Sequence, residues 1–465
     1  MMSWLTRITR RSPWGRFALG VSLTGVVFSA VGGAGVWIHE SFAQEGAVKS
    51  SSASVSQKSK KPLTSRHKAN EKSENPIPVK KTPEGFRMAV PGYQFEFPAD
   101  QASHPEYKTE WWYYTGHFKA KSLEHPEEEK SYGFELTFFR IANPKSDLPK
   151  LSGRAAQWDA SQMYMSHFAL TDVDGQRFMH SEKLNRKAYG RAGAKTGAYH
   201  VWNENWSAKR LPDGRHELHA ALRDQGENYT LDLVLTPSKP PVIHGHDGVS
   251  QKSSCEGCAS HYYSIPRLAL EGTLSQSNPK GKAAQSLQST QRVTGIAWMD
   301  QEFGSNQLAE NQTGWDWFSI QLSNGMDLML YQLRRRSKDP NKQNPMDEWE
   351  HPTLDASSSG TLIYPDGRSE HLNLSDFSVT ATSSWTSPQS RGRYPMSWDI
   401  RIPKHQVRLN VIPKLKNQEL FLPFQQGLTY WEGACTVEGR YGEQILGGTS
   451  YVEMTGYAQA FESKI

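Results

Sequence analysis

The sequence lacks most of the features that would assign it to a well-known class of protein. Its 465 residues include only three cysteines, so it is not a small domain held together by disulfides. The mean hydropathy of −0.68 excludes a polytopic membrane protein. The chain has no Gly-x-Ser-x-Gly elbow, Walker loop or dinucleotide-binding glycine motif. The sequence therefore gives no sign of a nucleotide cofactor or of an α/β-hydrolase nucleophile.

Basic charge is confined to the N-terminal part of the chain. The formal net charge is +5, but residues 1–83 hold 13 Lys and Arg against 4 Asp and Glu. The remaining residues hold 40 against 44, which is a net charge of −4. A nucleic-acid-binding body needs a concentrated basic face, so we expect no nucleic-acid partner.

The N-terminus has the pattern of an export signal. Four arginines precede Phe17–Ile38, a run without charge, and Ser41-Phe42-Ala43 follows as a cleavage site. The run is long enough to cross a bilayer, so the alternative for residues 1–43 is a retained membrane anchor. Either arrangement predicts a body that is exported to the periplasm or the extracellular space. Residues 44–83 are rich in Ser and Lys, which predicts a disordered linker.

The body is predicted to be all-β. Alternating apolar and polar residues occur at 132–140, 229–235 and 325–333. Turn signals separate such runs, at Asp174-Gly175, Asp213-Gly214, Asn324-Gly325 and Asp366-Gly367.

The body also contains an ordered internal repeat. Elements at 112–114, 132–140, 231–237, 271–272 and 295–300 recur in the same order at 317–319, 325–334, 407–413, 432–433 and 448–453. We therefore predict two related domains, at 84–305 and 306–465. Each has about eight strand-like runs, enough to close an antiparallel barrel that holds side chains or one small ligand.

Five aromatic-rich motifs carry a resemblance to a known family. They are Glu110–His117, Ser166–Phe168, His261–Ser264, Trp298–Gly304 and Tyr451–Tyr457. Together they resemble the AttH / carotenoid 1,2-hydratase (CrtC) family, over roughly 86–460. Many members of that family are described as predicted secreted hydrolases. The resemblance implies two tandem lipocalin-like barrels joined face to face.

The hydratase members add water to an isoprenoid double bond without a cofactor, which implies an acidic group that protonates the alkene. Asp300 and Gly304 match the hydratase motif. Trp298, Gln301 and Glu302 stand where that motif has Tyr, His and Asn, which argues against a carotenoid as substrate. An upstream His-x-aromatic element of the family falls on His261 and Tyr263.

Three acidic residues are candidates for chemistry. Asp300 and Glu302 are two residues apart on a predicted strand, so both side chains reach the same face. They form either an acid/base pair or a hydrogen-bond network that joins the domains. Glu110 is either a cavity acid or an acceptor for buried indole N–H groups. The aromatic segments 111–114 and 315–318 are either barrel core or a stacking surface for a flat or prenyl-like ligand.

A cluster of possible metal ligands lies at 244–261, with His244, His246, Asp247, Cys255, Cys258 and His261. Its spacing fits no common zinc finger, so we favour a disulfide or free thiols at Cys255 and Cys258 over a redox or metal site. We expect Cys435 to be a small buried hydrophobic residue. Ser166 and His167 are adjacent on a strand and point to opposite faces, so they cannot form a nucleophile–base pair.

Two functions remain. The first is an exported or membrane-tethered protein that binds a lipophilic molecule in or between its barrels, with no metal and no cofactor. We expect this ligand to contact Glu110, Trp111, Trp112, Tyr263, Trp298, Trp315 and Trp317. The second is a cofactor-independent hydratase or hydrolase in which Asp300 is the general acid, with Glu302 and His261 as further catalytic residues. Association with an envelope ABC transporter is a third expectation, implied by the family resemblance alone.

Overall fold

The computed structural model describes residues 79–125, 127–144, 160–277, 289–306, 309, 311–337, 349, 352–422 and 429–459. The chain divides into two units, Met1–Lys72 and Ser73–Ile465, and the description below concerns the second. The predicted signal or anchor and nearly all of the predicted linker lie outside the described residues. Within those residues, no helix is long and apolar enough to cross a membrane. The only helices among them are the 3-10 turns η1 (Ala99–Gln101), η4 (Ala188–Gly190), η7 (Leu374–Asp376) and η8 (Pro403–His405).

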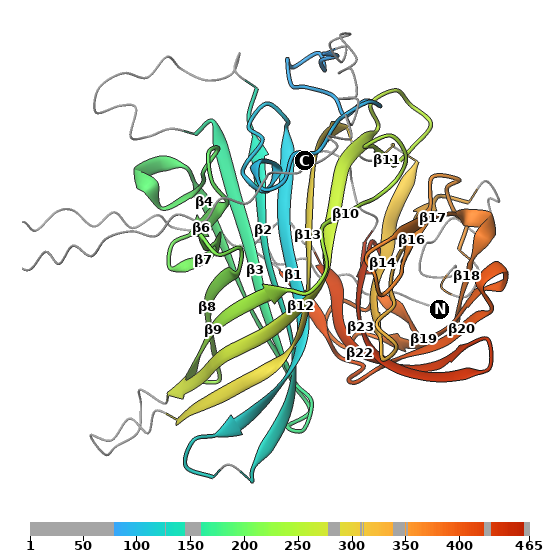
Figure 1. The fold of residues 1–465 in the computed structure, drawn as a ribbon. Coiled ribbons are helices and arrows are strands. Elements are labelled where there is room, and N and C mark those ends of the chain that lie inside the picture. Colours follow the sequence, from blue (N-terminus) through green and yellow to red (C-terminus); the bar gives the residue numbers. More distant parts are fainter. Residues whose placement is uncertain are drawn as a thin grey trace, which may run out of the picture. The chain divides into compact units, whose positions relative to one another are not determined.

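The first half of the body forms one antiparallel sheet in the order β4-β3-β2-β1-β13-β12-β9-β8-β7-β6-β5, with β10 and β11 added on β12. The two edge regions of this sheet lie close together, as the ion pair between Arg177 of β4 and Asp224 of β8 shows. The sheet is therefore a nearly closed barrel (Figure 1). Its strands are β1 (Thr109–Ser122), β2 (Glu129–Ala142), β3 (Gln162–Asp172), β4 (Arg177–Arg186), β5 (Ala192–Ala194), β6 (His200–Asn203), β7 (Trp206–Arg210), β8 (His216–Asp224), β9 (Glu227–Pro237), β10 (Val242–Ile243), β11 (Ser250–Gln251), β12 (Ala259–Ser277) and β13 (Ser289–Asn306).

The second half forms another antiparallel sheet in the order β17-β16-β15-β14-β23-β22-β20-β19-β18, with β21 added on β22. This sheet curls into a half-barrel, so the all-β, lipocalin-like fold class is confirmed although the second barrel is more open than the first. Its strands are β14 (Gln312–Leu322), β15 (Asp327–Arg335), β16 (Ser359–Ile363), β17 (Ser369–Asn373), β18 (Ser378–Thr386), β19 (Arg393–Ile402), β20 (Val407–Pro413), β21 (Glu419–Phe421), β22 (Thr429–Tyr441) and β23 (Gln444–Thr455).

The two sheets repeat one strand order. Strands β1, β2, β3, β4, β13, β12 and β9 occupy the places that β14, β15, β16, β17, β23, β22 and β20 occupy in the second sheet. The four predicted turns fall between β3 and β4, β7 and β8, β14 and β15, and β16 and β17. The sequence repeat therefore corresponds to a structural repeat over these seven strands of each sheet.

The strand register corrects the repeat at two places. Tyr113 pairs with Asp300 and Trp317 pairs with Glu453, so the counterpart of Trp317 is Tyr113 and not Trp112. By the same registers, 271–272 corresponds to 438–439 and not to 432–433. An error of one residue matters in a strand, because adjacent side chains point to opposite faces.

Alternation divides the apolar side chains into three clusters. One fills the first barrel and includes Trp112, Tyr114 and Trp206, all fully buried. Another fills the curve of the second sheet. The third lies between the sheets and contains Tyr113, Val242, Tyr262, Trp298, Trp317, Met329, Tyr331, Leu333 and Ile363. The sheets thus pack on each other through their outer faces.

The packing between the sheets is close at Gly133 of β2. A Cβ atom at this position would lie 2.5 Å from the Cβ of Ala434 in β22. Since real side chains do not approach so closely, only glycine permits this approach of the two sheets. The sheets also share hydrogen bonds here, for example from Thr171 Oγ1 to Gln418 Oε1 at 2.8 Å.

Candidate functional site

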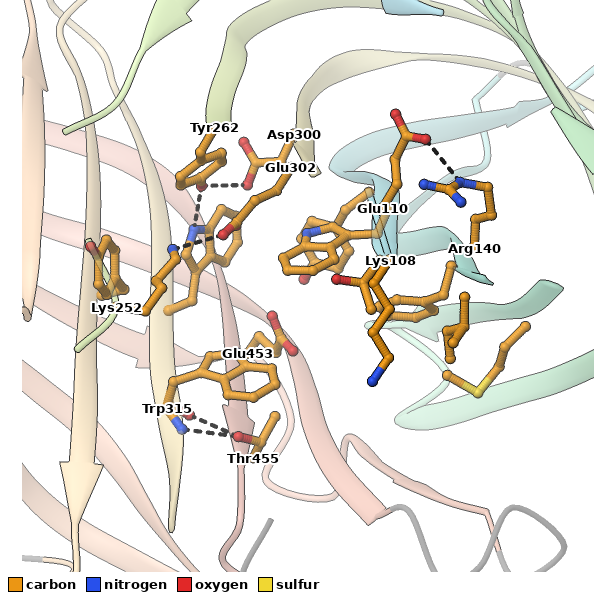
Figure 2. Close-up of a pocket in the computed structure, with 18 of the residues that line it drawn as sticks. Lys108, Glu110, Arg140, Lys252, Tyr262, Asp300, Glu302, Trp315, Glu453 and Thr455 are labelled. Atoms are coloured by element: carbon orange, nitrogen blue, oxygen red, sulfur yellow. Dashed lines mark hydrogen bonds and ion pairs between the residues drawn. The ribbon is translucent and has the colours of Figure 1, made fainter. Parts of the chain in front are cut away.

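A cavity of about 260 Å³ lies between the two sheets. Its walls are mostly apolar and include the aromatic residues Trp111, Tyr113, Phe139, Tyr262, Trp315, Trp317, Tyr331 and Tyr430. Among these rings lie the acidic groups Glu110, Asp300, Glu302 and Glu453, and the cations Lys108, Arg140 and Lys252 (Figure 2). An apolar pocket with a few converging polar groups is the usual form of a small-molecule site.

Asp300 of β13 is buried at the edge of this cavity, with 3% of its surface exposed. Its Oδ1 accepts hydrogen bonds from Trp298 Nε1 at 2.6 Å and from Ser264 Oγ, and its Oδ2 accepts one from Tyr262 OH at 2.9 Å. Burial opposes the carboxylate form more than these donors stabilise it, and the pKa of Asp300 rises from 3.8 to about 7. Asp300 can therefore both give and take a proton near neutral pH.

Glu302 lies two residues further along β13 and also lines the cavity. Its Oε1 accepts a hydrogen bond from Ser260 Oγ and lies 2.9 Å from the Nζ atom of Lys252. The Lys252 ammonium lies over the rings of Tyr331 and Tyr262, at 4.4 and 5.1 Å from their centroids. Glu302 thus has a buried ion-pair partner. Among the described residues no cation forms an ion pair with Asp300, which feels the Lys252 charge from further away.

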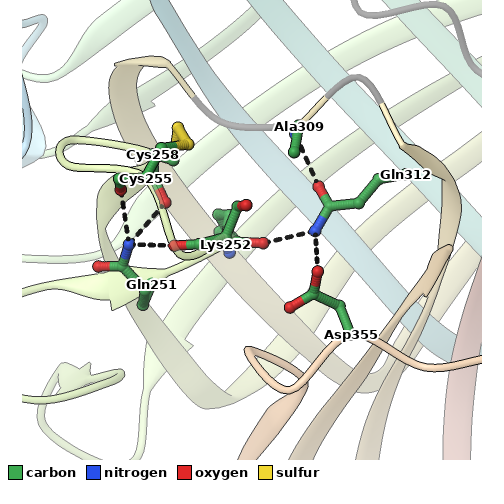
Figure 3. The surroundings of a disulfide bond; sticks show 8 residues. Gln251, Lys252, Cys255, Cys258, Ala309, Gln312 and Asp355 are labelled. Carbon is green, nitrogen blue, oxygen red and sulfur yellow. Dashed lines mark hydrogen bonds between the residues drawn. A yellow bond between two sulfur atoms is a disulfide. The ribbon is translucent and has the colours of Figure 1, made fainter.

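Lys252 is held by a disulfide-closed loop. Cys255 and Cys258 form a disulfide, in agreement with the favoured interpretation of the sequence. Lys252 N donates to Cys258 O at 2.9 Å, and Lys252 O accepts from Gln312 Nε2 at 2.6 Å (Figure 3). Gln251 Nε2 donates to Cys255 O and Cys258 O, at 3.2 Å each. The loop therefore fixes the backbone on which the cavity lysine stands.

Glu110 of β1 is fully buried at the opposite end of the cavity (Figure 2). It accepts hydrogen bonds from Arg140 Nε at 3.1 Å, from Gln301 Nε2 at 3.0 Å and from the backbone N–H of His104 at 2.9 Å. Burial would raise its pKa, but His104 and Arg140 outweigh burial and lower the pKa to about 2. Glu110 is thus an ionised structural group. Of the two roles expected for it, the indole-acceptor role matches none of the hydrogen bonds described, and Glu110 lines the cavity as an ionised acid.

A further acidic group, Glu453 of β23, faces the cavity from the second sheet. Burial raises the pKa of Glu453 to about 8, and the Asp300 and Glu302 charges add to this effect. Behind it lie the buried carboxyl groups of Glu432 and Glu135, whose pKa values burial also raises. Glu432 Oε2 accepts a hydrogen bond from Tyr113 OH at 2.7 Å, which links the two sheets.

A family model described as AttH-like matches residues 88–457. The chain belongs to the AttH-like family. An AttH protein from Nitrosomonas europaea is 30% identical, with a TM-score of 0.63 over 80% of this chain and 99% of that one. Kievitone hydratase from Nectria haematococca is 14% identical, with a TM-score of 0.53 over 82% and 97%, and shares the fold. Among proteins with curated descriptions, none matches the sequence.

This AttH-like chain brings part of the predicted site together. Asp300, Glu302, Glu110, Trp111, Trp315 and Trp317 line the cavity. Trp298 lies behind the wall and acts through its hydrogen bond to Asp300. Trp112 and Tyr263 belong to the core of the first barrel, where Tyr263 OH donates to Gln301 at 2.7 Å. The strand alternation thus places Tyr262, and not Tyr263, in the cavity.

His261 lies on the same face of β12 as Tyr263 and does not line the cavity. Its Nδ1 is 2.7 Å from Gly248 O, and its ring stacks on Tyr93 at a centroid distance of 4.1 Å. Burial lowers its pKa to about 4, so it is a neutral core histidine. Its position away from the cavity does not support the expected role of His261 as a catalytic residue beside Asp300.

Other predicted features have structural positions. Ser166 accepts a hydrogen bond from Asn203, whereas His167 turns to Tyr430 of the other sheet, so the two point apart as predicted. Cys435 is a buried free cysteine. Among the described residues, no three His, Cys, Asp or Glu side chains are grouped to hold a metal ion.

Sequence reasoning missed Tyr262, Lys252 and Glu453. The repeat carried a signal for the last, because it aligns Glu453 with Asp300. Lys252 had no such signal, since it reaches the cavity from an irregular loop between β11 and β12.

Proposed function

We propose that this AttH-like protein binds a lipophilic molecule between its sheets and adds water to a carbon–carbon double bond of it, with Asp300 as the general acid. The observation that carries the proposal is a buried carboxyl group with a pKa of about 7 at the edge of an aromatic cavity. Such a group holds a proton at neutral pH and can release it to a substrate. No cofactor is required for this reaction.

The contacts of Asp300 suit a proton donor. Its Oδ1 already accepts two hydrogen bonds, so Oδ2 is the oxygen that would carry the proton. After transfer to the alkene, the donors on Asp300 would stabilise the new carboxylate. The rings of Trp317 and Tyr262 would face the carbocation with their π-systems until water adds.

The cavity limits the size of the bound group. Ligand pockets usually measure about 300–1,000 Å³, and this one measures about 260 Å³. It suits a compact molecule or one end of a longer lipid- or isoprenoid-like chain.

A carrier that binds without converting its ligand is the second candidate. The Lys252–Glu302 ion pair favours this candidate, because Lys252 already binds the Glu302 carboxylate, which is the one nearest to Asp300 along β13. We also propose, from the charge pattern of residues 1–43 alone, that the protein is exported, with or without a membrane anchor. Association with an envelope ABC transporter fits such a location and stays a proposal.

The test is incubation of the exported body with envelope lipid extract in H₂¹⁸O, followed by mass spectrometry of captured and converted species. We expect the wild type to form a product that carries ¹⁸O. Asp300→Asn should retain capture and lose conversion by about 100-fold or more. Asp366→Asn, at an exposed turn, is the matched control.

The outcomes separate the candidates. Conversion that survives in Asp300→Asn would rule out the acid mechanism. Capture without conversion by the wild type would favour the carrier. A wild type that captures no lipid from the extract would contradict both.

A further inference from the structure

The duplication of the fold places two equivalent carboxyl groups in one cavity. Asp300 of β13 pairs with Tyr113 of β1, and Glu453 of β23 pairs with Trp317 of β14. Strands β13 and β23 hold the same place in their sheets. Because the sheets pack through these faces, the two acids reach the cavity from opposite walls (Figure 2).

We infer that Glu453 is a second catalytic acid–base residue, which faces the bound molecule from the sheet opposite to Asp300. The inference rests on the proposed function and adds to it the group that handles the proton of water. Glu453 lines the cavity and keeps part of its side chain accessible, as a group that touches a ligand must.

Glu453 has a side-chain hydrogen bond with Trp315 and is otherwise surrounded mainly by acidic groups. Its acidic neighbours are Asp300 and Glu302 of β13, Asp316 of β14, Glu432 of β22 and Glu135 of β2. Three of the nearby cations have other partners, since Lys252 pairs with Glu302, Arg334 with Asp316 and Arg140 with Glu110. Lys108 also lines the cavity. Among the described residues, no cation forms an ion pair with Glu453, Glu432 or Glu135.

The carboxyl groups behind Glu453 have unused hydrogen-bonding atoms. Glu432 Oε1, Glu135 Oε2 and Tyr451 OH are buried and have no hydrogen-bond partner among the described residues. Buried polar atoms of this kind usually bind water or exchange protons. They form a buried polar region next to the cavity, behind Glu453.

The reaction balances with these two groups. Asp300 gives its proton to one alkene carbon, and the oxygen of a water molecule bonds to the other. Glu453, in its ionised form, takes the proton that the water loses, so the product is an alcohol. The proton then returns from Glu453 to Asp300 through solvent. Like charges favour a state in which one acid of such a pair is protonated while the other is ionised. Because the pKa of Glu453, about 8, lies above that of Asp300, about 7, the reactive state with the proton on Asp300 is the less populated of the two singly protonated states.

The experiment compares Glu453→Gln with Glu438→Gln, an exposed glutamate on the neighbouring β22, under the H₂¹⁸O assay with envelope lipid extract. Glu453→Gln should capture as much lipid as the wild type and convert it about 100-fold or more slowly. The pH profile of conversion should change from bell-shaped to a single limb. The double variant with Asp300→Asn should be no slower than Asp300→Asn alone.

The outcomes distinguish this inference from the proposed function. Conversion that is lost in Asp300→Asn but normal in Glu453→Gln overturns the inference and leaves the proposed function intact. A wild type without conversion overturns both.

Infrared titration gives a test without turnover. Protonated carboxyl bands are followed with pH in the wild type and in Asp300→Asn. Loss of the Asp300 charge should lower the pKa of Glu453, because that charge raises it in the wild type. An unchanged Glu453 titration would show that the two acids do not interact, which contradicts the inference.

Discussion

Glu110 and Asp300 are both buried carboxyl groups that border one cavity, yet their charge states are opposite. Glu110 contacts the Arg140 guanidinium and the His104 ring, and its pKa falls to about 2. Asp300 contacts only neutral donors, and its pKa rises to about 7. Burial is the largest influence on both, so the presence of a buried cation decides the outcome. Only the uncompensated group can act as an acid near neutral pH.

The largest expected effect comes from removing the arginine whose positive charge pairs with the Glu110 carboxylate. Arg140→Met leaves a fully buried carboxylate at Glu110 that keeps its contact with His104 but has lost the Arg140 guanidinium. Breaking such a pair costs about 3–5 kcal/mol of unfolding free energy, which urea denaturation would measure. Lys119→Met, at an exposed position of β1, the strand of Glu110, is the control and should change stability little. A small loss in Arg140→Met would mean that His104 alone compensates Glu110.

A comparable effect should appear in the pH dependence of stability. The pKa of Asp300 is higher in the folded state, at about 7 against 3.8, so the native protein binds more protons and loses stability as pH rises through this range. Asp300→Asn should remove this loss, which is on the order of 4 kcal/mol at most. Glu110 acts in the opposite sense, because its pKa of about 2 makes its contribution disappear as pH falls below 4.5. Denaturation midpoints between pH 4 and 8 would check the first effect. A parallel decline in both proteins would contradict the assignment to Asp300.

A smaller effect is expected from the disulfide next to the Lys252 loop. Replacement of Cys255 and Cys258 by serine opens a very short loop, for which chain entropy gives a loss of about 2 kcal/mol. Thermal unfolding would measure it. Cys435→Ser shows the separate cost of changing a buried thiol. Equal stability with and without the disulfide would mean that Gln251 and Gln312 hold the loop by themselves.

The smallest expected effect concerns the pKa of Asp300 when a cation is removed from the cavity. Lys252→Met removes the cation from Glu302, and the freed negative charge should raise the pKa of Asp300 by about 1 unit. Asp300 would then stay protonated to higher pH. Infrared titration of the protonated carboxyl band measures this shift. A lower pKa in Lys252→Met would show that Glu302 becomes neutral when it loses its partner.

Much of the fold could be predicted because its signals are local. Alternation at 132–140 and 229–235 falls within β2 and β9, and the Asp-Gly and Asn-Gly turns fall between strands. The repeat also predicted the shared strand order. It failed by one residue at Trp112 and by six at Glu271, because a single sequence does not show register or bulges, such as the one between Ile265 and Leu268.

The candidate site was predicted less completely. Asp300 and Glu302 were expected on one face, and both do line the cavity. His261 and Tyr263 were expected beside them, but alternation along β12 turns both away and brings Tyr262 in. Motif matching identifies the strand, but an offset of one residue decides which face of the sheet a side chain occupies.

The sequence by itself determined the strands, their duplicated order and the family, because these depend on local alternation and on long aromatic motifs. Only the tertiary structure decided the location of the site. Apolar side chains fill the inside of each curled sheet, so the accessible cavity lies where the outer faces of the two sheets meet. It also decided which carboxyl groups are paired with cations, since Arg140, Lys252 and Glu453 come together from strands and loops far apart in the chain.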